Sequence, residues 1–182
     1  INHNTLVKIV MYDRGDYFKA IKFYKRAIKI DNNWFKPKKN LGIVFLLLED
    51  FNSGFEFFES RLKKTTKKEY NIPFIKSPQW KGENLSGKII LILSEQGYGD
   101  IIHFSRYIFK LKKDFDVNII FRTHKSLCHL YNKTNFSVIS NDDRIPTHHF
   151  HCYLLSLPKL LYEKNKILLN QNNFIKENKI IY

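Results

Sequence analysis

The hydrophobic pattern divides the chain into two parts with different periods. Up to about residue 66, apolar residues recur every three or four positions, as on one face of a helix, and no stretch alternates as a strand does. The clearest stripes are Ile21, Tyr24, Ala27 and Ile28, and then Phe51, Phe55, Phe58 and Leu62. Turn-forming residues interrupt the pattern at 31–33 and 50–53. Residues 1–66 are therefore predicted to form several helices.

From residue 88 onward, short apolar runs alternate with helical segments. The run 88–94 is continuous and β-branched, which is typical of a strand buried on both faces. Further strands are predicted at 116–122, 136–140 and 152–155, and helices at 99–113, 125–132 and 157–162. Such alternation indicates parallel β-α-β units, so residues 88–182 are predicted to be a Rossmann-like α/β domain. Prolines and glycines punctuate residues 67–87, which are predicted to be a connector.

The helical part repeats with a period of 34 residues. The matched pairs are Val7 and Leu41, Met11 and Phe45, Tyr17 and Phe51, Ala20 and Gly54, and Tyr24 and Phe58. Small residues recur where two helices would touch, and aromatic residues recur where they would pack the next helix. The pattern resembles the tetratricopeptide repeat, a helix–turn–helix unit of this length. Three positions depart from its consensus, namely Lys8, Asn32 and Arg61.

Two such repeats are too few to bury their faces unaided. We therefore expect further repeats before Ile1, together with packing of the stack on the domain that follows. Arrays of this kind offer a groove to peptides, so the resemblance implies a peptide or protein partner.

Composition narrows the class of protein only slightly. The chain has 31 Lys+Arg against 17 Asp+Glu, a formal charge of +14, but the lysines are scattered. A solvated basic surface explains this pattern, and we do not expect nucleic-acid binding. No apolar stretch approaches the roughly 20 residues that span a bilayer. Two cysteines do not make a disulfide framework, and the expected compartment is the cytoplasm.

The segment with the most distinctive chemistry follows the first predicted strand and runs from Ser94 to Asp100. Gly97 and Gly99 allow a sharp turn and the close approach of a ligand, and the following helix start presents amide groups to an anion. The segment lacks the third glycine of the dinucleotide fingerprint, and Arg122 stands where an acid would bind the ribose. NAD and FAD are therefore not expected.

Three charged residues have alternative roles. Asp100 is a candidate general base, or else it only caps the helix or stabilises its first turn. Glu95 is a second candidate, or it binds the amides of the glycine loop. Arg106 is a candidate to bind a phosphate; the alternative is that it forms an ion pair with Asp100 or a neighbouring acid.

Several runs together are similar to one bacterial family. They are Pro78-Gln79-Trp80 with Gly82, Leu85 and Gly87; Glu95-Gln96-Gly97 with Gly99-Asp100, Ile102, Phe104 and Arg106-Tyr107; and Leu154-Leu155-Ser156-Leu157-Pro158. They resemble tetratricopeptide-repeat proteins with a heptosyltransferase-like glycosyltransferase domain, related to glycosyltransferase family 9, of the GT-B fold.

The resemblance implies transfer of a sugar from a nucleotide-sugar donor to an acceptor hydroxyl, with Asp100 as the base and no metal. It implies a substrate-binding loop of Glu95, Gln96, Gly97, Tyr98 and Gly99, with Arg106 nearby. By this resemblance the chain stops at Tyr182, near the end of the family's first domain, so we expect the donor-binding half to be missing from this chain and the chain alone to be inactive.

Other patterns are open to plainer interpretations. His148, His149 and His151 with Cys152 suggest zinc ligands, but neighbours along a strand point to opposite faces, and no metal site is expected. Trp80 packs the connector onto the α/β domain or stacks on a sugar. The competing function for the whole chain is a non-catalytic scaffold that binds proteins through its repeats.

Overall fold

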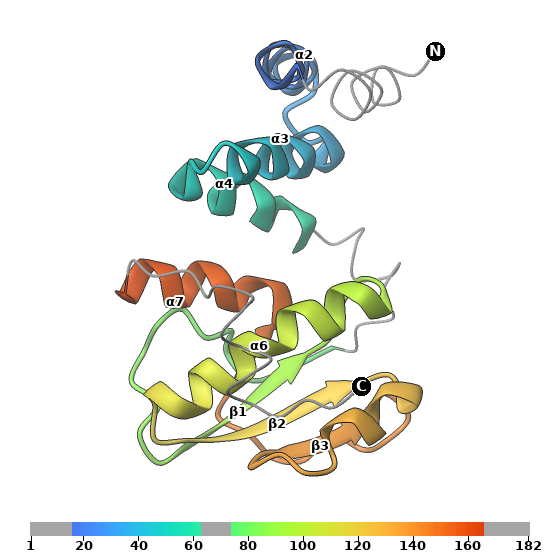
Figure 1. Ribbon diagram of the computed structural model, residues 1–182, viewed down its shortest axis with the longest axis vertical. Helices are drawn as coiled ribbons and strands as arrows, with labels where there is room; N and C mark the ends of the chain where they lie inside the picture. Colours follow the sequence, from blue (N-terminus) through green and yellow to red (C-terminus); the bar gives the residue numbers. More distant parts are fainter. Residues whose placement is uncertain (1–15, 63–73, 166–182) are drawn as a thin grey trace. The chain divides into compact units, whose positions relative to one another are not determined.

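The computed structural model describes residues 16–62 and 74–165, and side chains as far as residue 163. The chain forms two compact units, Ile1–Asn71 and Ile72–Tyr182 (Figure 1), which are described separately below. The sequence predictions for Val7, Lys8, Met11, residues 63–73 and residues 166–182 lie outside the described residues. Within the described part of the chain, no helix is both long and apolar enough to cross a membrane.

The first unit is helical, as the sequence predicts. Its described elements are α2 (Tyr17–Ile30), α3 (Phe35–Leu47), α4 (Phe51–Phe58) and the 3₁₀ helix η1 (Glu59–Leu62). Asp16 caps α2 by accepting a hydrogen bond from the Lys19 amide at 3.0 Å, and Asp50 caps α4 by accepting from the Ser53 amide at 3.1 Å. The two caps lie 34 positions apart, which is the period found in the sequence. The local structure therefore repeats where the sequence does.

Small residues allow α3 and α4 to approach closely. A Cβ added at Gly42 would lie 2.5 Å from the Phe58 nitrogen and 2.8 Å from the Gly54 oxygen, both backbone atoms. A Cβ at Gly54 would lie 2.7 Å from a terminal methyl of Leu46. These two glycines thus lie at a helix contact, which the match of Gly54 with Ala20 predicts. The neighbouring α2–α3 contact is built from Ala20, Tyr24, Leu41 and Val44, all 0 or 1 % exposed.

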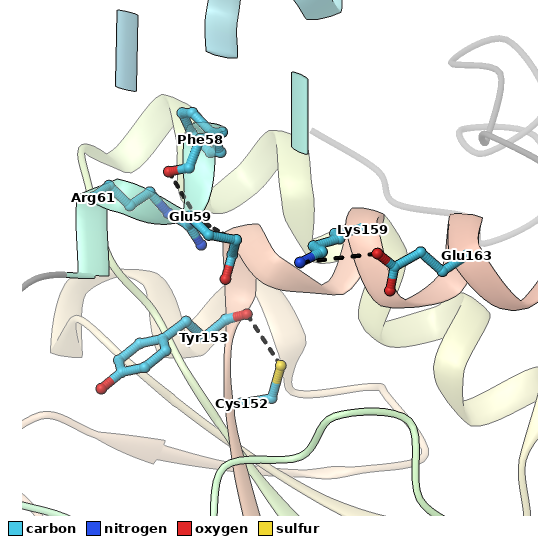
Figure 2. Close-up of polar contacts among 7 residues, drawn as sticks. All are labelled: Phe58, Glu59, Arg61, Cys152, Tyr153, Lys159 and Glu163. Atoms are coloured by element: carbon cyan, nitrogen blue, oxygen red, sulfur yellow. Dashed lines mark hydrogen bonds and ion pairs between the residues drawn. The ribbon is translucent and has the colours of Figure 1, made fainter. Parts of the chain in front are cut away.

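Arg61 replaces the small residue that the repeat pattern calls for, and the local structure differs there. The α-helix ends at Phe58, and Arg61 lies in η1 with only 1 % of its surface exposed. Its guanidinium pairs with the Glu59 carboxylate at 2.5 Å and lies over the Phe58 ring, 4.6 Å from the centroid (Figure 2). The buried charge is therefore compensated by its own turn of helix.

The second unit is a parallel α/β sheet. Its strands are β1 (Lys88–Leu93), β2 (Val117–Thr123), β3 (Ser137–Ser140) and β4 (Phe150–Tyr153), in the order β3-β2-β1-β4. All three pairings are parallel. This order matches the first four strands of the doubly wound order 3-2-1-4-5-6, in which β1 and β4 flank the point where the order reverses. Ile90 to Leu93 of β1 are at most 1 % exposed, so the core surrounds the central strand.

The connecting helices are α6 (Tyr98–Asp114), the 3₁₀ helices η2 (Lys125–Tyr131) and η3 (Leu154–Ser156), and α7 (Leu157–Asn165). In Figure 1, α6 lies across the sheet with α7 beside it. Two predicted elements differ from those observed. The segment 125–132 was predicted as a regular helix and is 3₁₀ over 125–131. The last strand, which the sequence predicts at 152–155, spans Phe150–Tyr153. It begins at Phe150 because that residue pairs with Ile90 of β1, and the chain from Leu154 onward turns away from the sheet.

Part of the predicted connector belongs to this sheet. The Trp80 amide donates to the His151 carbonyl at 2.8 Å, and the His151 amide donates to the Pro78 carbonyl at 3.0 Å, so the connector pairs with the outer edge of β4. The Trp80 side chain is 1 % exposed, and its Nε1 donates to the Glu83 carbonyl at 2.9 Å. Trp80 therefore packs the connector onto the sheet, and its burial excludes the alternative of stacking on a sugar.

Candidate functional site

The segment between β1 and α6 lies at the carboxyl edge of the sheet. The Ser94 amide donates to the Arg122 carbonyl at 2.9 Å, which continues the pairing with β2 one residue beyond the strand. The left-handed residue of the turn is Gln96, with φ 71°, whereas Gly97 has an ordinary φ of −77°. The sequence-based explanation of the turn is therefore corrected, because Gln96 rather than a glycine takes the unfavourable conformation. Its cost is about 1–2 kcal/mol.

The two glycines leave space above the start of α6. A Cβ built at Gly99 would meet nothing within 4 Å, and one built at Gly97 would meet only the Asp100 Oδ2, at 3.8 Å. Gly97 is the N-cap of α6, so Asp100 is not the cap residue. Asp100 lies in the first turn with its side chain exposed. The structure therefore places an accessible carboxylate beside amide groups that lack covering side chains.

Glu95 lies in a different environment from Asp100. It directly follows the Ser94 pairing, and only 3 % of its surface is exposed. Two hydroxyl groups, Ser94 Oγ and Thr123 Oγ1, are also buried at the ends of β1 and β2 without a hydrogen-bond partner among the described residues. Buried polar groups therefore lie beneath the loop at the carboxyl edge of the sheet. Of the two acids, Glu95 is buried with them and Asp100 is exposed.

Tyr98 joins the start of α6 to the segment after β2. Its ring centroid lies 4.9 Å from that of His124, and its hydroxyl accepts a hydrogen bond from Ser126 Oγ at 3.2 Å. About half of the Tyr98 surface remains exposed. The sequence places Tyr98 in the loop but does not indicate that His124 and Ser126 lie beside it. The rule that the carboxyl ends of parallel strands share one edge could have found them.

Arg106 lies on α6, and 5 % of its surface is exposed. Its Nε donates to the His103 carbonyl at 2.8 Å, and its terminal nitrogen contacts His103 Nε2. The Tyr107 ring centroid lies 5.9 Å from the guanidinium carbon. Among the described residues Arg106 forms no ion pair with Asp100 or with any other acid, so that alternative is wrong. Whether it binds a phosphate stays a prediction.

The contact with Arg106 favours the neutral form of His103. An arginine only donates hydrogen bonds, so His103 Nε2 faces a donor. Partial burial lowers the pKa of His103, and the charge of Arg106 lowers it further, while the Asp100 carboxylate opposes the shift. Burial likewise lowers the pKa of Arg106. Burial and the charge of Arg106 therefore favour the neutral form of His103, which lies within electrostatic range of Asp100.

The histidines near β4 have separate backbone partners. His149 Nδ1 accepts a hydrogen bond from the Ile89 amide at 3.0 Å, and His148 Nδ1 lies 2.8 Å from the Pro146 carbonyl. His151 Nδ1 lies 2.9 Å from the Ser77 carbonyl. The thiol of Cys152 donates to the Tyr153 carbonyl at 3.4 Å (Figure 2). Over residues 16–62 and 74–165, no three histidine, cysteine or acidic side chains are grouped as metal ligands would be.

Comparison of the chain with protein-family models, with curated proteins and with solved structures gives no match in any of the three. Functional assignment therefore depends on the residues and geometry described above.

Proposed function

We propose that the second unit is the acceptor-facing half of a heptosyltransferase-like glycosyltransferase of the GT-B type. Support comes from the resemblance of residues 78–107 and 154–158 to that family, and from the strand order β3-β2-β1-β4. The observation that carries the proposal is the exposed Asp100 beside Gly97 and Gly99, at the carboxyl edge where parallel sheets bind ligands.

In the proposed reaction, Asp100 removes the proton from an acceptor hydroxyl. The acceptor oxygen then forms a bond to the anomeric carbon of the donor sugar, and the bond from that carbon to the nucleotide diphosphate breaks. Amide groups of Gly97, Tyr98 and Gly99 stabilise negative charge near the reacting oxygen. Glu95 and Gln96 shape the loop from below, and Arg106 holds the neutral His103 next to Asp100.

The test is release of nucleotide from sugar nucleotides by the full-length protein, because a GT-B site lies between two α/β domains and the described residues contain one. We expect Asp100→Asn to lower turnover by at least 100-fold, since general-base catalysis typically contributes that much. Asp114→Asn is the matched control, because Asp114 lies at the other end of α6 from Asp100, where its carboxylate pairs with Lys110 at 2.8 Å. Equal turnover in the two variants would remove Asp100 from the mechanism.

A second candidate is a scaffold function for the first unit, of the tetratricopeptide type. The repetition of the Asp16 and Asp50 caps at 34 residues favours it. A leucine at Gly42 would force α3 and α4 apart. Loss of a bound protein from Gly42→Leu, with transferase activity retained, would favour the scaffold. Retained binding would exclude the repeat as the binding surface.

A further inference from the structure

The outer face of α2 carries a concentration of positive charge. Its exposed cationic residues are Lys19, Lys22, Lys25, Arg26 and Lys29, which we call the α2 cationic face. At 100° per residue these positions lie within an arc of about 120° on the helix. The helix contains no acidic residue. The opposite side, with Ala20, Tyr24 and Ala27, is buried.

Within residues 16–62 and 74–165, no acidic side chain neutralises the charges of this face. None of the five cationic groups forms an ion pair there, and among the five side chains only that of Lys25 has a further contact, lying 6.0 Å from the Phe45 ring centroid. Like charges on adjacent turns repel one another and cost stability. The arrangement is thus mildly unfavourable unless an anionic partner lies against it.

Exposed apolar and acidic residues at the two ends of the helix limit the chemical class of that partner. Phe18 and Ile30 lie at the two ends of the face and are 80 % and 77 % exposed, so a partner with apolar groups gains more than a bare phosphate chain. Beyond them lie the exposed acids Asp16 and Asp31. These acids are about 22 Å apart along the axis and would repel a flat anionic membrane or a long polyanion running past the helix.

We propose that the α2 cationic face binds a short acidic segment of a partner protein. The space between Phe18 and Ile30 is about 18 Å, which matches five or six extended residues. Acidic side chains on the side of the segment that faces the helix pair with cations of this face, and apolar residues at its two ends contact Phe18 and Ile30.

The test uses the intact chain and a synthetic peptide of five glutamates flanked by leucines, with binding followed by fluorescence anisotropy. We expect Lys22→Glu with Arg26→Glu to weaken binding at least tenfold, equivalent to about 1.4 kcal/mol. The control is Lys76→Glu with Lys133→Glu, two exposed lysines of the other unit that change the net charge equally. We expect it to change binding less than twofold. Circular dichroism confirms that both variants fold.

Phe18→Ser separates the apolar contribution from the charge, and we expect it to weaken peptide binding several-fold while leaving the salt dependence unchanged. Equal weakening by the two charge-reversal pairs would overturn the proposal, because the attraction would then be diffuse. Failure of the peptide to bind would also overturn it. So would tighter binding of an oligothymidylate of 20 nucleotides, or of phosphatidylcholine vesicles containing phosphatidylserine.

Discussion

The packing of α3 on α4 leads to a quantitative expectation for Gly42→Ala. The added Cβ would lie 2.5 Å from the Phe58 nitrogen, whereas ordinary contacts begin at 3.4 Å. The helices must therefore separate by about 0.9 Å, since backbone atoms do not rotate away. Overpacking of this kind costs about 1–3 kcal/mol, and we take the upper half of this range. Replacing glycine by alanine within a helix returns about 1 kcal/mol. The net loss expected is about 1–2 kcal/mol.

The assay has to separate the two units, because their unfolding need not be a single transition. Hydrogen exchange followed by mass spectrometry reports on residues 35–58 and residues 88–123 separately. We expect faster exchange only in the first segment, and a fall of about 5–15 °C in its melting temperature. Gly99→Ala is the matched control, because its Cβ meets nothing within 4 Å, and it should not destabilise the protein. If Gly42→Ala is as stable as the unmodified chain, the close approach of α3 and α4 is refuted.

Three further expectations concern single side chains. Asp50→Ala removes the cap of α4 and should cost the first unit about 1 kcal/mol in urea unfolding; no loss would contradict the cap. Trp80→Ala removes a buried ring that lies edge-on to Phe115 and should cost the second unit about 3–5 kcal/mol; a loss below 1 kcal/mol would show that the connector is not packed. The lowered pKa of His103 means that the unfolded chain binds more protons, so the second unit should lose stability as the pH falls through about 6.5. His103→Gln should flatten that pH dependence, and an unchanged slope would contradict the shift.

The sequence predicts elements well where a short-range pattern determines them. Asp50 precedes an apolar stripe and caps the helix that the stripe forms. The run 88–94 contains the strand Lys88–Leu93, because a continuous β-branched run is favourable only where both faces are buried. Gly54 lies at a helix contact, as its 34-residue match with Ala20 indicates.

The features that the sequence does not predict depend mostly on contacts between residues far apart in the chain or on compensation of buried charge. Pairing of the connector with His151 joins residues more than 70 positions apart, and no periodicity encodes it. The burial of Arg61 depends on Glu59 and Phe58 compensating its charge, which composition does not reveal. At the candidate site, the sequence predicts that Asp100 lies in the first turn of the helix. It does not predict the left-handed backbone conformation of Gln96, because glycine adopts that conformation more favourably and two glycines lie nearby.

The most direct test of the proposed ligand site is the transfer rate of the full-length protein carrying Gly99→Leu. A Cβ built at Gly99 meets nothing within 4 Å, so we expect a leucine there to extend into open space and thermal unfolding to be unchanged. We also expect transfer to fall at least 100-fold, because the leucine would occupy the position of the acceptor beside Asp100. Transfer at the unmodified rate by a correctly folded Gly99→Leu protein would show that the ligand does not bind at this turn.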